Sequence, residues 1–210
     1  ELGGEQVVHL ADAGRVVHLD LDLDRALLPR LDPDLVDRRR REGVDAVLAA
    51  FSGPRCQVLR HHALGFDPEL RRELLALNTS GADELHRAAL AANALARCYA
   101  QAVQALLQAA DIPASAVQAI GAHGQTVRHR PGAFDGTGYT LQLNNPALLA
   151  ECTGIRVVAD LRSRDVAAGG QGAPLVPAFH QFQFGQPGQD ALVMNIGGIA
   201  NLSVLRADGS

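Results

Sequence analysis

Apolar side chains recur at helical spacing in two stretches of the chain. Pro68 to Leu77 begins with proline and continues with leucines on one face, which predicts a short helix. A longer helix is predicted to begin at a capping box formed by Ser80 and Asp83 and to end near Ala110, before Pro113. Its apolar stripe is narrow and rich in alanine, which allows close approach to a neighbouring element. The stripe consists of Leu85, Ala89, Ala92, Ala96, Tyr99, Val103 and Leu106.

Strands are predicted where apolar residues alternate with polar ones or form a short continuous run. Val16 to Asp24 alternates, with Leu19, Leu21 and Leu23 on one face. Ile155 to Ala159 is nearly all apolar, which predicts a strand buried on both faces. The other predicted strands are Val44 to Phe51, Val117 to Gly121, Tyr139 to Leu143, and a hairpin of Ala191 to Ile196 with Ala200 to Leu205.

Short helices are predicted between these strands. Asn145 is a good helix cap, Pro146 suits the first helical position, and Gly154 is typical of the residue that follows a helix. Pro174 to Phe184 is also predicted to be helical. Because strands alternate with helices along the chain, the fold class is α/β, with a mixed sheet flanked by helices.

Composition and charge narrow the class of protein. The chain has 210 residues, of which 47% are apolar and 20% charged, the balance of an ordinary globular protein. A net charge of −4 gives no electrostatic footprint for nucleic acid, and no apolar run reaches the ~18 residues of a membrane helix. Three widely spaced cysteines argue against a disulfide framework or a zinc site. Since the N-terminus shows no secretory signal, the predicted location is cytoplasmic.

Candidate chemistry lies in segments that combine glycine with polar side chains at strand ends, where open α/β sheets bind ligands. In Gly121 to Thr126, Gly124 allows close backbone approach, and His123 and Gln125 can donate and accept hydrogen bonds. This composition suits the hydroxyl and amide groups of a sugar. The residues alone leave open a second interpretation, a tight turn with a packed histidine.

The segment Asp160 to Asp165 places two arginines and two aspartates at the end of a predicted strand. Arg162 and Arg164 are candidates for binding a carboxylate or a phosphate, because a guanidinium can grip either in a bidentate way. A surface ion-pair cluster has the same composition and is only weakly stabilising. The sequence leaves both interpretations open.

Two glycine-rich turns complete the candidate segments. Gly169 to Pro174 precedes a predicted helix, so its N–H groups are expected to point at an anion or a polar ligand; a flexible linker is the alternative. Gly197 and Gly198 lie between two predicted strands, in a hairpin whose N–H groups can cradle phosphate. By itself, that glycine pair fits a plain turn better than a ligand site.

Three segments appear together in the order and spacing of one family: Ala122 to His129, Asp160 to His180 and Asn195 to Leu202. Through them the chain resembles the anhydro-N-acetylmuramic acid kinases over roughly Gly43 to Leu205. The resemblance implies an actin-like, two-lobed sugar-kinase fold. It also implies ATP with Mg²⁺, an amino-sugar substrate, 1,6-anhydro-N-acetylmuramic acid, and a homodimer. In the family a water opens the anhydro ring, and the product of this cell-wall recycling step is N-acetylmuramic acid 6-phosphate.

The resemblance further implies domains and site residues. Residues 1–42 match poorly, residues 43–190 correspond to the N-terminal, sugar-binding lobe, and residues 191–210 to the first hairpin of a largely missing second lobe. The catalytic Asp of the family is expected beyond Ser210, and no metal ligand is assigned. Substrate-binding residues are expected at His123, Gly124, Gln125, Asn145, Arg162, Arg164, Asp165 and Gln171. Nucleotide-binding residues are expected at Gly43, Asp45, Asn195, Gly197 and Gly198.

Some residues depart from the family pattern. Where the family has a Ser-Gly-Thr-Ser-Leu-Asp-Gly-Val-Asp phosphate hairpin, this chain has Asp37 to Asp45, of which only the Gly-Val-Asp end matches. The arginines in that stretch are too bulky for close approach to phosphate, and our hypothesis is a shifted reading frame or a wrong start upstream of Glu42. Leu161 and Ser163 replace a Phe and the middle Arg of the family's Phe-Arg-Arg-Arg-Asp run.

Competing hypotheses follow from these departures. The first is a carbohydrate kinase that is inactive as these residues stand. The second is a non-catalytic, amino-sugar-binding or interaction module derived from such a kinase. A different actin-like sugar kinase or ATPase is disfavoured by the His-Gly-Gln and Arg-Asp segments at their observed spacing. In either remaining case, the hairpin of Ala191 to Leu205 is expected to expose an apolar edge.

Overall fold

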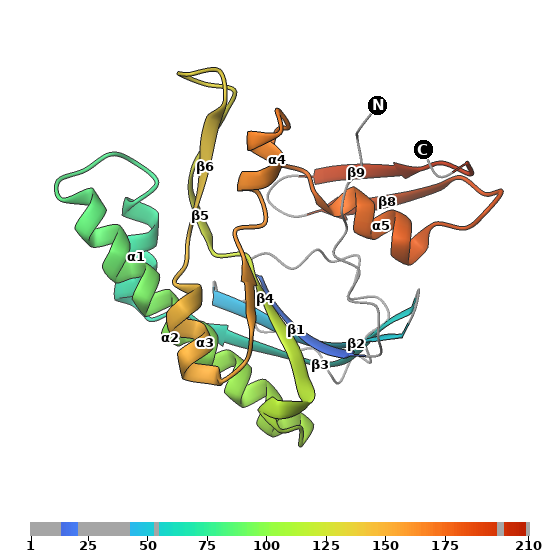
Figure 1. The fold of residues 1–210 in the computed structure, drawn as a ribbon, viewed down its shortest axis with the longest axis horizontal. Coiled ribbons are helices and arrows are strands. Elements are labelled where there is room, and N and C mark those ends of the chain that lie inside the picture. Colours follow the sequence, from blue (N-terminus) through green and yellow to red (C-terminus); the bar gives the residue numbers. More distant parts are fainter. Residues whose placement is uncertain (1–13, 21–42, 53–54, 197–199, 209–210) are drawn as a thin grey trace.

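The sheet at the centre of the molecule holds five strands in the order β3-β2-β1-β4-β7 (Figure 1). The computed structural model describes residues 14–20, 43–52, 55–196 and 200–208. The strands are β1 (Gly14–Asp20), β2 (Gly43–Ser52), β3 (Arg55–Gly65), β4 (Val117–Ala122) and β7 (Val157–Ala159). Because β1, β2 and β3 pair antiparallel while β1–β4 and β4–β7 pair parallel, the sheet is mixed, as predicted.

Most of the sheet was predictable from its apolar pattern. The predicted strands at Val44 to Phe51 and Val117 to Gly121 are confirmed by β2 and β4. The strand predicted at Val16 to Asp24 is confirmed as far as Asp20, and residues 21–24 lie outside the described residues. Strand β3 was not predicted, because a polar stretch that includes His61 interrupts its apolar pattern.

Strand β7 occupies the edge of the sheet, where it pairs with β4 through Ala122 and Ala159. Its middle residue, Val158, is 41% exposed. The prediction that Ile155 to Ala159 is buried on both faces is therefore wrong, because an apolar run does not distinguish an edge strand from a central one.

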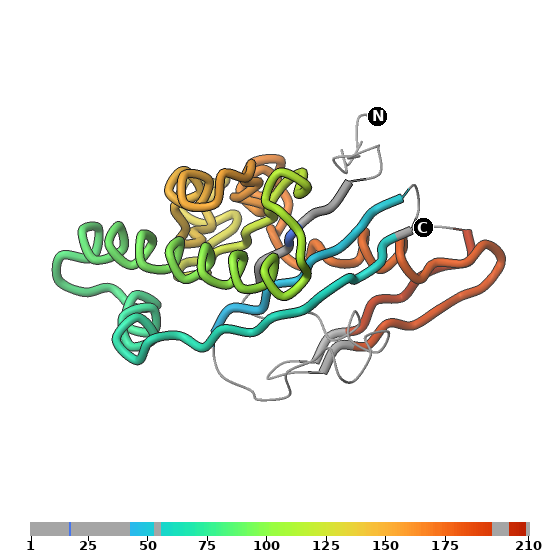
Figure 2. Tube along the Cα trace, turned by 90° about the horizontal axis from the view of Figure 1, so that it is seen from below, coloured from blue at the N-terminus to red at the C-terminus, as the bar shows by residue number. Residues whose placement is uncertain are grey.

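Helices α2 (Glu84–Ala110) and α3 (Pro146–Thr153) cover one face of the sheet (Figure 2). The short 3-10 turn η3 (Ala114–Ala116) leads from α2 into β4. The core between them includes Val17, Val44, Ala46, Leu48 and Ile120 from the sheet and Leu95, Ala96, Tyr99, Val103 and Leu106 from α2. Each fully buried valine, leucine or isoleucine side chain among these contributes about 1.5–3 kcal/mol relative to an exposed one. Within the described residues, no helix is long and apolar enough to cross a membrane.

The first turns of α2 lie beside helix α1 (Pro68–Ala76) and not on the sheet. Leu85 is 89% exposed, and Ala91 packs with Leu74 and Leu77 in a second apolar cluster. The predicted stripe is therefore wrong in its first turns, where α1 offers a different face to pack against. Helix α1 itself is confirmed, and the Asp67 carboxylate caps it.

Predicted helix ends are partly confirmed. The capping box is wrong: Asp83 is the cap of α2, has φ 51° and makes no capping bond with its side chain. The Gly81 N–H instead donates to Glu84 Oε2 over 3.4 Å. For α3 the prediction is confirmed, since Asn145 Oδ1 accepts from the Leu148 N–H and Gly154 follows the helix with φ 68°.

Two hairpins and two short helices complete the fold (Figure 1). Hairpin β5 (Gln125–Pro131) and β6 (Gly138–Leu143) projects from the sheet; β6 was predicted and β5 was not. In its turn, Asp135 accepts hydrogen bonds from the Gly138 and Thr137 N–H groups, which lowers the pKa of that carboxyl. The other elements are α4 (Ser163–Ala167), α5 (Val176–Phe184), β8 (Ala191–Ile196) and β9 (Ala200–Leu205). The β8–β9 hairpin and helix α5 were predicted, whereas α4 was not.

Candidate functional site

Polar segments leave neighbouring ends of two parallel strands. Ala122 at the end of β4 pairs with Ala159 at the end of β7. His123 and Asp160 follow these residues directly, so the segments that begin there start side by side. This is the edge at which open α/β sheets bind ligands, and it is where the sequence placed the candidate chemistry.

Arg162 connects the segment Gly121 to Thr126 with the glycine-rich segment Gly169 to Pro174. Its Nε donates to His123 Nε2 over 2.7 Å, and its Nη1 donates to the Gly172 carbonyl over 2.6 Å. The other ring nitrogen of His123, Nδ1, lies 2.7 Å from the Gly124 carbonyl oxygen. The structure therefore brings these predicted residues together through direct hydrogen bonds, in a half-buried environment.

Asp165 holds the glycine loop, Gly169 to Pro174, through two hydrogen bonds. Its Oδ2 accepts from the Gly172 N–H over 2.7 Å, and its carbonyl accepts from the Gly170 N–H over 2.8 Å. A β-carbon at Gly170 would collide with the Asp165 carboxylate. Glycine is required here because the carboxylate fills the space that a side chain would need. We name His123, Arg162, Asp165 and Gly172 the polar cluster.

Several N–H groups of the glycine loop donate hydrogen bonds to residues of helix α4. Gly169 donates to the Val166 carbonyl over 3.0 Å, in addition to the bonds from Gly170 and Gly172 to Asp165. Three of the N–H groups expected to point at an anionic or polar ligand therefore bond to α4 in this conformation. The flexible-linker alternative does not describe the loop, because the N–H groups of Gly169, Gly170 and Gly172 are bonded to residues of α4.

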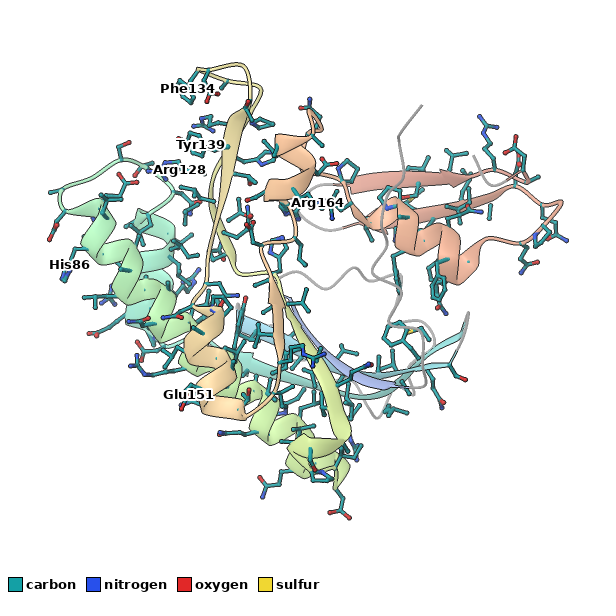
Figure 3. The ribbon with its side chains drawn as sticks, in the orientation of Figure 1. His86, Arg128, Phe134, Tyr139, Glu151 and Arg164 are labelled. Carbon is teal, nitrogen blue, oxygen red and sulfur yellow. The ribbon has the colours of Figure 1, made fainter. Side chains whose placement is uncertain are left out.

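Arg164 and Gln171 are the exposed members of the predicted sugar site. Figure 3 shows Arg164 on helix α4. Neither side chain has a hydrogen-bond or ion-pair partner among the described residues. Their donors are thus available to a ligand, whereas Arg162 already uses Nε and Nη1 to bond His123 and Gly172.

Asn145 lies apart from the polar cluster in its bonding. Its Oδ1 caps helix α3, and its Nδ2 donates to Asn93 Oδ1 over 2.7 Å. Its neighbour Asn144, which sequence reasoning missed, packs against Gly124 and donates to the Ala122 carbonyl over 3.4 Å. The Asn144 Oδ1 atom is buried and has no partner among the described residues. The signal was the pair of adjacent asparagines, of which only the helix cap was considered.

The predicted nucleotide side is less complete. Gly43 is packed so closely against Leu64 that a β-carbon would collide with the Leu64 carbonyl. Asp45 Oδ1 lies 2.8 Å from Nε2 of His61, a buried histidine on β3. The side chain of Asn195 and all of Gly197 and Gly198 lie outside the described residues. Within the described ranges, no group of three or more His, Cys, Asp or Glu side chains is placed to hold a metal ion.

Comparison with known proteins decides which family carries this arrangement. A family model described as anhydro-N-acetylmuramic acid kinase matches residues 39–210. The chain belongs to the anhydro-N-acetylmuramic acid kinase family. The match contains the polar cluster, the β5–β6 hairpin and the β8–β9 hairpin.

Individual members of the anhydro-N-acetylmuramic acid kinase family are similar along most of this chain. A protein of that name from Albidiferax ferrireducens is 68% identical over 164 residues, which are 78% of this chain and 42% of the relative. The proteins of the same name from Variovorax paradoxus and Bordetella petrii are 63% and 64% identical, over 79% and 84% of this chain and 44% and 46% of their own. The chain thus spans less than half the length of these relatives.

In this member of the anhydro-N-acetylmuramic acid kinase family, a further row of polar side chains links the polar cluster to the β5–β6 hairpin. His129 Nδ1 lies 3.0 Å from Thr140 Oγ1, and Gln142 Nε2 donates to both Thr140 Oγ1 (2.7 Å) and Thr126 Oγ1 (3.2 Å). A β-carbon at Gly172 would lie 3.4 Å from His129 Cε1. Sequence reasoning missed this row, although Thr140 and Gln142 alternate on one face of a predicted strand.

Proposed function

We propose that this chain forms the sugar-binding part of an ATP-dependent kinase that acts on 1,6-anhydro-N-acetylmuramic acid. The reaction opens the anhydro ring with water, transfers the γ-phosphoryl group to the liberated 6-oxygen and yields N-acetylmuramic acid 6-phosphate for cell-wall recycling. The observation that carries the proposal is the polar cluster, built from family-specific segments at the carboxyl ends of β4 and β7. The names of the relatives support the substrate.

The chemistry of the residues in and around the polar cluster suits this substrate. The sugar carries a lactyl carboxylate, which matches the exposed guanidinium of Arg164. Its hydroxyl and acetamido groups match the side-chain amides of Gln125 and Gln171. Asp165 uses Oδ2 to hold Gly172, while Oδ1 has no partner among the described residues. A carboxylate held in this way can accept a hydrogen bond from a hydroxyl group of the sugar through Oδ1.

The nucleotide part of the proposal rests on the family. Gly43, Asp45, Asn195, Gly197 and Gly198 are the residues that we propose to face ATP. Bound Mg²⁺–ATP would supply the phosphoryl group and the neutralisation of its charge. We further propose a cytoplasmic location and a homodimer. Sedimentation of the purified chain would test the dimer.

Calorimetric titration tests sugar binding directly. We expect a saturable heat when 1,6-anhydro-N-acetylmuramic acid is added to the 210-residue chain. N-acetylglucosamine is the matched control, because it keeps the acetamido group and lacks both the lactyl carboxylate and the anhydro bridge. No heat with either sugar, or equal heats with both, would contradict the proposal.

A turnover assay separates a kinase from the alternative, a non-catalytic sugar-binding module. With ATP, Mg²⁺ and the anhydro sugar, we expect no ADP release from these 210 residues, because the motif that carries the family's catalytic Asp, Gly-(aromatic)-Asp-x-Gly-Pro-Gly-Asn, is not among them. ADP release would show that the residues of this chain suffice for catalysis. Binding without turnover agrees with both interpretations, so the same assay on a chimera completed with the remainder of a relative then decides between them.

A further inference from the structure

We propose that Arg162 is a positioning residue that holds His123 in its Nδ1–H tautomer, and that Arg164 alone of the two arginines binds the anionic group of the ligand. The inference deepens the proposed function and rests on it for the identity of that ligand. Sequence reasoning treated the two arginines as equivalent arms toward a carboxylate. Their surroundings in the structure are different, and the difference carries the proposal.

The bond between Arg162 and His123 permits only one form of the imidazole. A guanidinium donates hydrogen bonds and cannot accept them. Since Arg162 Nε lies 2.7 Å from His123 Nε2, that ring nitrogen must be the unprotonated acceptor. The proton of the neutral ring is then on Nδ1, which donates to the Gly124 carbonyl over 2.7 Å. An imidazolium would place an N–H group against the N–H of Arg162.

The same form removes His123 from contact with a ligand through its nitrogens. Both ring nitrogens are bonded to the protein, one to a side chain and one to the backbone of Gly124. The backbone of Gly124 adopts φ 80° at the point where β5 begins, and a β-carbon there would meet the Leu143 carbonyl. His123 therefore fixes the peptide at the entrance of β5, and Arg162 fixes His123.

Arg162 makes a second hydrogen bond, which would be lost if its side chain rotated toward solvent. Its Nη1 donates to the Gly172 carbonyl over 2.6 Å. Gly172 is itself held in place, because its N–H donates to Asp165 Oδ2 over 2.7 Å. Turning Arg162 toward a ligand would leave the His123 Nε2 and the Gly172 carbonyl without these donors. Hydrogen bonds from a charged donor are stronger than those between neutral groups, so their loss is unfavourable.

Arg164 differs in each respect. It lies two residues further along the chain, within α4, its side chain is exposed, and the described residues offer it no hydrogen-bond or ion-pair partner. Binding an anion through Arg164 breaks no internal bond, whereas a bidentate grip through Arg162 competes with its bonds to His123 and Gly172, because Nη2 is its one guanidinium nitrogen without a partner among the described residues. The arginine available to the carboxylate is therefore Arg164.

The tautomer can be read by NMR without any ligand. The chain is labelled with ¹⁵N-histidine, and long-range ¹H–¹⁵N correlations are recorded for its eight histidines, with His123→Gln used to assign the signals of His123. We expect a protonated Nδ1 and an unprotonated Nε2 in the wild-type chain and in Arg164→Gln. We expect the pattern to change in Arg162→Gln. An Nε2–H form in the wild type, or an unchanged pattern in Arg162→Gln, would overturn the proposal. The wild-type spectrum decides even if Arg162→Gln fails to fold.

The dependence of sugar affinity on salt distinguishes the two arginines functionally. A direct contact between charges weakens as ionic strength rises. We expect Arg164→Gln to weaken binding of 1,6-anhydro-N-acetylmuramic acid and to flatten its salt dependence. We expect Arg162→Gln and Arg162→Lys to weaken binding about tenfold or more, since a charge-assisted network is broken, while the salt dependence of the wild type is kept. If Arg162→Gln flattens the salt dependence and Arg164→Gln does not, Arg162 is the anion-binding arginine and the proposal is wrong. If the wild type binds no sugar, the proposed function fails, and the histidine spectrum still decides the role of Arg162.

Discussion

The polar cluster and the β8–β9 hairpin differ in how their surfaces are completed. In the polar cluster, side chains and backbone from separate segments satisfy one another, as Arg162 does for His123 and Gly172. The hairpin has a buried side, where Ser203 and Leu205 pack, and an outward side that is apolar and exposed. The exposed residues on that side are Leu192, Met194, Leu202 and Val204, with exposed fractions of 68%, 60%, 52% and 48%.

Strand register makes this outward side one continuous surface. Leu192 pairs with Val204, and Met194 pairs with Leu202, so the four side chains are cross-strand neighbours. A two-stranded sheet is only marginally stable by itself in water. The sugar side is thus organised by bonds within the described residues, while the hairpin offers an apolar surface that they do not cover. The hypothesis that it exposes apolar groups agrees with the structure, although the groups lie on a face and not only along an edge.

The largest expected effect is a loss of stability when a leucine in the core between the sheet and α2 is truncated. Leu95 of α2 has an exposed fraction of 0%, and Leu192 of β8 has one of 68%. Truncation of a buried leucine typically costs 2–5 kcal/mol, so we expect Leu95→Ala to lower the free energy of unfolding by about that amount. Leu192→Ala is expected to change it by less than about 0.5 kcal/mol. Urea denaturation measures both, and equal losses would show that the hairpin surface is covered after all.

A smaller effect is expected from overfilling the polar cluster. A β-carbon at Gly170 collides with the Asp165 carboxylate, whereas one at Gly81 meets only the flexible end of Arg87 at 3.1 Å. We expect Gly170→Ala to cost about 1–3 kcal/mol of stability, the usual range for overpacking, and to weaken sugar binding. Gly81→Ala is the control and should be close to neutral. Denaturation and calorimetry of both variants check this, and a neutral Gly170→Ala would mean that the carboxylate is not held where the structure places it.

The inner side of the hairpin gives the next effect. His180 Nδ1 lies 2.8 Å from Ser203 Oγ, and both side chains are buried between α5 and β9. Loss of one such bond typically costs about 0.5–1.5 kcal/mol, so Ser203→Ala should speed amide hydrogen exchange in β8 and β9. Ser80→Ala is the control, because Ser80 does not cap α2 in the structure. Faster exchange in the Ser80→Ala variant at the start of α2 would restore the capping box.

The smallest expected effect is on the surface of the scaffold, where Arg87 and Glu73 pair over 2.7 Å between α2 and α1. The hydrogen bond from Arg87 lowers the pKa of Glu73. A lowered carboxyl pKa stabilises the fold above the ordinary carboxyl range, and this stabilisation is lost as the pH falls through the lowered value. In Arg87→Gln we expect the Glu73 pKa to rise toward its ordinary value. NMR titration of the Glu73 carboxyl measures the shift, and the same pKa in both chains would show that the pair does not form in solution.

Local pattern was enough to predict the elements whose burial alternates cleanly. The Asn145 cap, the Gly154 helix end and the β8–β9 pairing were all read from residue types with direct backbone consequences. The polar edge at β4 and β7 was also predicted, because glycine and charged residues stop apolar strands there. What the sequence could not supply was the partner of each polar group. Nothing in the order of residues shows that Arg162 bonds to His123 and not to a ligand.

Long-range packing explains the other differences. Strand β3 carries histidines within its apolar residues, and His61 is buried because it contacts Asp45 on β2. The first turns of α2 pack on α1, so the Leu85 end of the apolar stripe is exposed. In both cases a contact between distant segments overrides the local period. The hypothesis about Asp37 to Glu42 lies outside the described residues and stays a hypothesis.

Titration of the ¹⁵N-labelled chain with 1,6-anhydro-N-acetylmuramic acid tests most directly whether the polar cluster is the sugar site. Amide shifts report where the ligand binds along the whole chain in one experiment. We predict saturable shifts around the cluster, at Gly124, Gln125, Arg164 and Gln171, with little change at Val193 and Ser203 in the β8–β9 hairpin. Saturable binding whose shifts fall in the hairpin and leave the cluster unchanged would contradict the account.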